Sequence, residues 1–320
     1  MGEFTNKSAD GEIEDDTGKQ NRLKVYGAAL LFSFIVGFSF LGVKASIAVA
    51  TPLEVLTYRF NFAALGALLP VVAMFVKINI KGKPLSRLIV PAGFYIGFMI
   101  FQVIGLRYSS SIESGIIFAI IPIFAKIIAQ YYLGEKGDWK ENIFVCLSIA
   151  SVIAMFVFSA TDFGGVNIQG ILLLLLSSVL MALSNVLMRG VRRDFSPYSI
   201  AFAIALGGCL VFNAATIAAG IASGEPTGYF EPLRHWEFIV ATAFLGIPST
   251  LISSLLMAYM LANMEAVKAT VFGNLSTGIS IVAGVLFLKE TLELYHIICT
   301  IFIIVGVIGT SMGSRRGVNR

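Results

Sequence analysis

The chain alternates long apolar runs with short polar stretches. A helix needs about 20 apolar residues to cross the hydrocarbon core of a bilayer, and ten runs come close to this length. They lie at 26–49, 53–76, 88–107, 112–133, 141–160, 168–188, 198–222, 236–260, 265–288 and 293–312. The segments between them are short, so the pattern predicts an all-α integral membrane protein with ten transmembrane helices.

One stretch of this pattern occurs twice. Residues 106–135 recur without a gap as 261–290, with few identities but the same form: a polar lead-in, a charged residue, a long apolar run and a closing glutamate. Glu113 falls on Lys268, and Glu135 falls on Glu290. A repeat that contains membrane-length segments predicts two related halves, which are typical of transporters.

The positive charges predict how the two halves are oriented. With the N-terminus inside, most Lys and Arg of the short loops fall on the cytoplasmic face, and the other face receives Lys44, Arg107, Arg234 and Lys289. Cytoplasmic loops carry the excess of such residues, so both termini are expected in the cytoplasm. Five spans in each half then make the repeat an inverted one.

The expected organisation has four parts. A polar, acidic segment at 1–24 is predicted to be a disordered cytoplasmic tail, because it has few large apolar residues. The first repeat is expected at 25–160, the second at 167–312, and a short cytoplasmic tail at 313–320.

Composition excludes several classes of protein. Hydrophobic residues make up 57% of the 320 and charged residues 13%, whereas a soluble domain has about a quarter charged. The three cysteines lie in separate apolar spans, and the two histidines, His235 and His296, form no metal-binding motif. We therefore expect no metal and no cofactor. A net charge of +4 spread over short loops also argues against a nucleic-acid partner.

Several of these features resemble the EamA-like ten-helix transporters of the drug/metabolite transporter superfamily. The residues that carry the resemblance are Pro52 with Tyr58, Arg59 and Phe60, the stretch 106–135 with Pro122 and Leu133-Gly134-Glu135, the stretch 266–292 with Leu288-Lys289-Glu290, and Gly306-Val307. The resemblance implies two five-helix repeats around a central cavity, with the fifth and tenth spans at the periphery. It also implies transport of small organic solutes by alternating access.

The sequence departs from the family pattern at three places. Thr277 stands where the ninth span would have a proline, Lys289 replaces the usual glycine before the closing glutamate, and Ile204 stands at the place of Arg59 in the second half. The two halves are therefore chemically different, and an asymmetric substrate site is expected.

Ionisable residues inside spans are candidates for the site, because a charged side chain at mid-bilayer costs about 2.5–3.5 kcal/mol on insertion scales. Lys126 lies deepest, on a helical face with Pro122, which frees a backbone carbonyl and predicts a helix kink. Asn274 and Thr277 form a polar stripe on the matching face of the ninth span. These faces are expected to line a cavity. Alternatively, Asn274 and Thr277 bond neighbouring helices, and Lys126 pairs with a carboxylate or extends to the interface.

Arg59 could grip a carboxylate or phosphate of a solute, or it could form a structural ion pair with Glu54 or Glu113. Glu113 is the candidate for proton coupling, and the alternative is an acid in the first turn of a helix, following Ser109-Ser110-Ser111. Further hydrogen bonds to a solute are expected from Tyr95, Gln102 and Asn185. Glu135 and Glu290 are expected to cap, anchor loops or gate.

The sequence therefore predicts a secondary transporter, and not an enzyme, that moves small metabolites such as amino acids, with export as the favoured direction. Uptake or exchange of phosphate- or nucleotide-linked solutes and drug efflux are alternatives in the same fold, and a lipid-metabolism enzyme is the alternative of another class. The expected partners are a small solute, the lipid bilayer and a coupling proton. We expect a monomer or weak homodimer in a bacterial plasma membrane.

Overall fold

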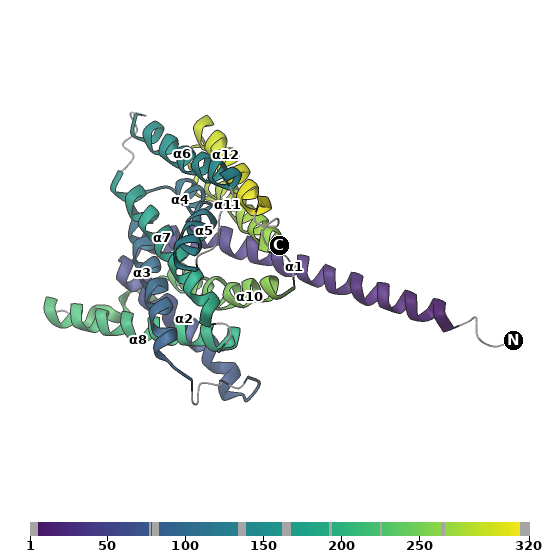
Figure 1. The fold of residues 1–320 in the computed structure, drawn as a ribbon. Helices are drawn as coiled ribbons and strands as arrows, with labels where there is room; N and C mark the ends of the chain where they lie inside the picture. Colours follow the sequence, from purple (N-terminus) through teal and green to yellow (C-terminus); the bar gives the residue numbers. More distant parts are fainter. Residues whose placement is uncertain are drawn as a thin grey trace.

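The protein folds as a bundle of helices (Figure 1). The computed structural model describes residues 6–76, 78, 83–133, 139–161, 168–191, 194–224, 226–263 and 266–313, and these residues contain no strand. The elements are α1 (Asn6–Ile47), α2 (Pro52–Val72), α3 (Ser86–Tyr108), α4 (Ser111–Phe118), α5 (Ile121–Leu133), α6 (Trp139–Thr161), α7 (Ile168–Val191), α8 (Pro197–Ser223), the 3₁₀ helix η1 (Pro226–Arg234), α9 (Trp236–Gly246), the π-helix η2 (Ile247–Ile252), α10 (Ser253–Asn263), α11 (Ala266–Leu288) and α12 (Leu294–Gly313).

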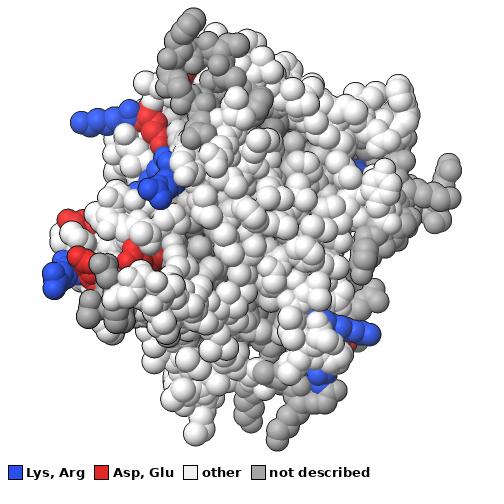
Figure 2. All heavy atoms as spheres, turned by 90° about the vertical axis from the view of Figure 1, so that its left-hand side faces the viewer, with Lys and Arg blue, Asp and Glu red and all other residues white. Residues whose placement is uncertain are grey.

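Seven stretches of the described residues are long and apolar enough to cross a membrane. They are Leu23–Ile47, Pro52–Val72, Ser86–Tyr108, Ser111–Tyr131, Ile168–Met188, Pro197–Ser223 and Trp236–Met260. Shorter apolar stretches occur in α6, α11 and α12. On the face in Figure 2, a broad uncharged surface separates groups of charged side chains near the edges, as expected for a protein embedded in lipid.

The first helix differs from the sequence prediction. Helix α1 begins at Asn6 and runs on to Ile47, through most of the segment that was expected to be a disordered tail. The membrane-compatible part begins at Leu23. A helix that is already formed extends by one hydrogen bond per residue without a new nucleus. Because the added residues include Lys, Glu and Gln, which have high helix propensity, extension is physically reasonable.

Close helix packing depends on small residues. Along the contact between α3 and α7, Gly105 faces Leu174 and Ser177 Oγ donates a 3.0 Å hydrogen bond to the Phe98 carbonyl. Along α1 and α11, Ser33 Oγ donates to the Phe272 carbonyl at 2.7 Å. Small residues let helix backbones approach where lipid offers no hydrophobic drive for association.

The pattern of contacts is reciprocal between the halves. Helix α1 packs against α9, α10 and α11, and α7 packs against α3, α4 and α5. Helices α2 and α8 pack on each other, and so do α6 and α12 at the edge of the bundle (Figure 1). Helix α1 begins the first half and α7 begins the second. Each of these two helices therefore packs against the third and fourth apolar segments of the other half. A duplicated chain is expected to pack in this way, and the inverted orientation of the halves stays a prediction.

Two of the membrane-compatible segments depart from regular α-helix near their centres. The fourth is divided between α4 and α5 at Ala119 and Ile120, just before Pro122, which has no N–H to donate. The stretch Trp236–Met260 changes from α9 to the π-helix η2 at Ile247 and Pro248 and continues as α10, so it stays helical throughout. Discontinuous helices at membrane depth are a feature of substrate sites in secondary transporters.

Candidate functional site

Arg59 is buried within α2, where its side chain is 2% exposed. The helix begins at Pro52, and Thr51 with Glu54 forms a capping box in which Glu54 Oε2 accepts from the Thr51 N–H at 2.7 Å. Glu113 is engaged in the same way with Ser110 at the start of α4. The two carboxylates considered as ion-pair partners of Arg59 therefore cap their own helices. Among the described residues, no carboxylate forms an ion pair with Arg59.

The guanidinium is held by the π-helix η2. Its Nε donates to Thr250 Oγ1 at 2.9 Å, and its Nη2 donates to Ser249 Oγ at 3.4 Å. Thr250 Oγ1 in turn donates to the Leu245 carbonyl at 2.8 Å. Gly246 lies directly against the backbone of Arg59, where a Cβ would collide with the Arg59 carbonyl, so α2 and the end of α9 meet at close range.

One nitrogen of Arg59 remains without a partner. Nη1 is buried and makes no hydrogen bond. Tyr95, on α3, is buried, and its hydroxyl lies near Arg59 and Thr250. A guanidinium with one free N–H edge, held by neutral hydroxyls, can accept a carboxylate or phosphate oxygen.

Gln102 lies two helical turns from Tyr95 on the same face of α3. It is 4% exposed, and its Oε1 is buried without a hydrogen-bond partner. The structure therefore brings together Arg59 and Tyr95 and places Gln102 further along the same helix face. Arg59 Nη1 is thus a buried unpaired nitrogen, and Gln102 Oε1 is a buried unpaired acceptor further along α3.

The other candidates lie elsewhere. Lys126 is half-buried on α5, and Asn185 is exposed on α7. Thr277 is buried in α11, where its Oγ1 donates to the Gly115 carbonyl of α4 at 3.1 Å, so this hydroxyl joins two helices. The side chain of Asn274 lies outside the described part of the structure.

A second polar cluster lies where α4, α11 and α1 meet. Glu113 is 5% exposed, and its Oε2 accepts from the Ser110 N–H at 2.9 Å and the Ser110 hydroxyl at 3.1 Å. Glu290 follows α11 and accepts hydrogen bonds from Ser111 and Ile112 at the N-terminus of α4. Lys44, on α1, lies within electrostatic range of both carboxylates. Glu290 thus has the capping role expected from the sequence, but it caps a helix of the other half. Glu135 lies outside the described residues.

Sequence reasoning missed Ser249 and Thr250. The signal was available in Gly246-Ile247-Pro248-Ser249-Thr250, where a proline and two hydroxyls interrupt an apolar span. It also missed a polar seam between α2, α8 and η1, in which Asn61 Nδ2 donates to the Tyr229 hydroxyl at 3.0 Å, and Tyr229 donates to Asn213 Oδ1 at 2.5 Å. Asn61 lies two residues after Arg59 but was not recognised because its partners are far away in the sequence.

Comparison with known proteins agrees with this architecture. The model of the EamA-like transporter family matches residues 23–157 and, separately, residues 168–312. The uncharacterized transporter YcxC of Bacillus subtilis (strain 168) is 36% identical over 303 residues, which cover 94% of this chain and 97% of that protein.

More distant proteins show the same likeness. An uncharacterized transporter of Archaeoglobus fulgidus is 24% identical over 278 residues, which cover 85% of this chain and 92% of the Archaeoglobus protein. A solved crystal structure superposes on this chain with a TM-score of 0.58 and 16% sequence identity. The match covers 89% of this chain and 98% of the chain in that structure, which shows a shared fold. The chain belongs to the EamA-like transporter family, in the drug/metabolite transporter superfamily.

Proposed function

We propose that this protein is a secondary transporter for small organic solutes that carry an anionic group, and that Arg59 binds this group. The observation that carries the proposal is a buried guanidinium with an unpaired Nη1 and no ion-pair partner among the described residues. Burying a cation without a counter-charge is costly. A solute carboxylate would supply the missing charge.

The neighbours of Arg59 narrow the chemistry of the solute. Ser249, Thr250 and Tyr95 are neutral, so the cluster has a single formal charge. One guanidinium suits a carboxylate better than a multiply charged phosphate or nucleotide, which would call for several cations. The unpaired Oε1 of Gln102 would accept a hydrogen bond from an N–H or O–H of the same solute. Amino acids and hydroxy acids combine these two features.

Alternating access is the mechanism that these features support. The two separate family matches and the reciprocal helix contacts are what two related halves would produce. The hydroxyls that hold Arg59 come from a π-helical stretch within a long apolar helix, and π-helical stretches are frequent at functional sites. Rocking of one half against the other would expose Arg59 to each side of the membrane in turn.

The direction of transport and the position in the cell rest on sequence patterns. The Lys and Arg of the loops favour cytoplasmic termini in a bacterial plasma membrane, and we propose export. Uptake, exchange and drug efflux use the same architecture. Lys126 and Asn274 remain proposed contributors to the solute site. Glu113 remains the proposed group for proton coupling, in addition to its capping role.

Counterflow in proteoliposomes tests this proposal. Vesicles loaded with amino acids or small organic anions are assayed for accumulation of the same labelled solute, with wild type, Lys126→Ala and Glu113→Gln. We expect wild type to accumulate a carboxylate solute, Lys126→Ala to weaken this, and Glu113→Gln to remove dependence on a pH gradient. If neither substitution alters transport of any solute found, those two residues are not part of the site. Preference for uncharged solutes would contradict the anion proposal.

A further inference from the structure

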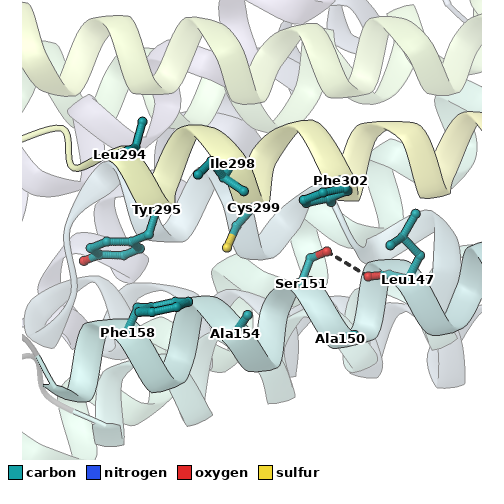
Figure 3. Close-up of a pocket in the computed structure, with 10 residues that line it drawn as sticks. All are labelled: Leu147, Ala150, Ser151, Ala154, Phe158, Leu294, Tyr295, Ile298, Cys299 and Phe302. Carbon is teal, nitrogen blue, oxygen red and sulfur yellow. Dashed lines mark hydrogen bonds between the residues drawn. The ribbon is translucent and has the colours of Figure 1, made fainter.

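A groove with a volume of about 610 Å³ lies between α6 and α12, at the edge of the bundle. In Figure 3, Tyr295 and Cys299 of α12 point toward the side of Phe158 and Ala154 on α6. The lining residues are Leu147, Ala150, Ser151, Ala154, Phe158, Leu294, Tyr295, Ile298, Cys299 and Phe302. None of them belongs to the cluster around Arg59, so the groove is separate from the proposed solute site.

The groove has a cause in the packing of the two helices. Beyond one end, α6 and α12 touch closely, because Gly306 lies against Ser148 and Gly309 lies against the ring of Phe144. At the other end, Phe158 and Tyr295 stack with their ring centroids 6.1 Å apart. Glycines thus bring the helices together at one end, and aromatic rings hold them apart at the other.

The groove has a closed floor and open walls. Cys299 and Ser151 are buried, whereas Phe158, Ile298 and Phe302 are among the exposed large apolar side chains. Ser151 Oγ donates to the Leu147 carbonyl at 2.8 Å, so its donor is used within α6 (Figure 3). The lining contains no charged residue. An occupant must therefore be apolar along its length.

The dimensions suit one narrow occupant. From Leu147 to Phe158 the helical rise gives a length of roughly 16 Å. One leaflet is about half of the roughly 30 Å hydrocarbon core. The volume lies in the range of single-ligand sites, which is about 300–1,000 Å³. Tyr295 marks the end near the start of α12, and tyrosines are enriched at the level of lipid headgroups.

We propose that this groove binds one acyl chain of a phospholipid, with the headgroup beyond the Phe158 and Tyr295 end. The chain fills the wedge between α6 and α12 and contacts Cys299 at the floor. A second copy of this protein is a less suitable occupant, since a stable interface between proteins buries about 1,600 Å² over a broad surface, and the groove admits only a narrow insert. The lipid site does not depend on the proposed solute.

Photolabelling tests this site. The protein is placed in phosphatidylcholine vesicles that contain a phosphatidylcholine with a diazirine on one acyl chain, illuminated and mapped by peptide mass spectrometry. We expect adducts at 147–158 and 294–302 to exceed several-fold those on other exposed apolar surfaces, such as the surface around Leu65 and Leu210. Ala154→Phe should fill the groove and reduce the groove adducts several-fold. Ile153→Phe, which adds bulk on an exposed position of α6 outside the groove, should leave them unchanged.

Three results would overturn the proposal. Adducts spread evenly over all exposed apolar faces would indicate ordinary surrounding lipid. Undiminished groove adducts in Ala154→Phe, purified as a protein that elutes like wild type, would exclude the site. Disulfide-linked dimers formed by Phe302→Cys in vesicles would assign the groove to a second copy. If Ala154→Phe does not fold, Ile298→Trp is used in its place. Ile298 lies on α12, so the larger side chain fills the groove from the opposite helix.

Discussion

The carboxylate of Glu290 binds the N-terminus of α4 at Ser111. Glu290 Oε1 accepts from the Ser111 N–H at 2.8 Å, and Oε2 accepts from the Ser111 hydroxyl at 2.7 Å. A carboxylate at a helix N-terminus satisfies free N–H donors and interacts favourably with the helix dipole. The bond joins residues 179 positions apart, so it fixes the end of α11 to the start of α4.

Replacing Glu290 with glutamine should lower stability. Glu290→Gln loses the charge and one acceptor oxygen, and we expect it to lower the free energy of unfolding by about 1–3 kcal/mol. The measurement is the thermal unfolding midpoint of the purified protein in detergent. Glu293→Gln is the control, because Glu293 is exposed close by and does not cap α4. Equal midpoints for Glu290→Gln and wild type would contradict the importance of this cap.

Lys289 occupies a backbone conformation that favours glycine. Its φ is 55°, in the left-handed region, at the place where the family pattern has glycine. Lys289→Gly should therefore raise the free energy of unfolding by about 1 kcal/mol, because glycine adopts this conformation without strain. The measurement is the thermal unfolding midpoint. Lys289→Ala removes the charge but keeps the strain, so it should not raise the midpoint. A gain of the same size in both variants would mean that the charge, and not the backbone, is responsible.

Gly115 allows α4 and α11 to cross closely. A Cβ at Gly115 would collide with Ser280 Oγ, so Gly115→Ala should lower the free energy of unfolding by about 1–3 kcal/mol through overpacking. Gly93→Ala is the control, because a Cβ there meets nothing within 4 Å. Adding Ser280→Ala to Gly115→Ala removes the colliding oxygen and should recover part of the loss. A double variant no more stable than Gly115→Ala would show that Ser280 is not the obstacle.

Thr250 should affect transport through Arg59. Thr250→Val removes the acceptor of Arg59 Nε while keeping the shape of the side chain, and Thr250→Ser keeps the acceptor. We expect Thr250→Val to raise the KM for a carboxylate solute about tenfold, equivalent to about 1.4 kcal/mol, and Thr250→Ser to stay close to wild type. Initial rates in proteoliposomes over a range of solute concentrations check this. Equal KM values for the two variants would exclude the positioning role.

Much of the fold could be predicted from the sequence because lipid imposes a simple rule. Every backbone group in hydrocarbon must be paired, so apolar runs of sufficient length are helices. Pro122 likewise indicated where the fourth span would break, because proline cannot donate. The helical extension of α1 back to Asn6 was not predicted, since a polar segment gives no apolar periodicity.

The site was only partly predictable. Arg59 was a candidate because a charged side chain is costly within a span, and Tyr95 was a candidate because its hydroxyl could bond a solute; their role in solute binding stays a prediction. Ser249 and Thr250 were missed because hydroxyls often bond their own helix, and only the packing of α2 against η2 shows that Arg59 uses them. Thr277 and Glu113 illustrate the opposite problem, since the sequence left two interpretations open for each. Only the structure shows that Thr277 donates to the Gly115 carbonyl of α4 and that Glu113 caps α4.

Arg59 is the group proposed to bind the anionic end of the solute. The most direct measurement compares proteoliposome transport of a carboxylate solute, identified by counterflow, with transport of its uncharged carboxamide analogue, in wild type, Arg59→Gln and Arg87→Gln. Arg87 is an exposed arginine that pairs with Asp194 and serves as the charge-matched control. We expect wild type and Arg87→Gln to prefer the carboxylate, and Arg59→Gln to lose this preference. An unchanged preference in a folded Arg59→Gln protein would contradict the account.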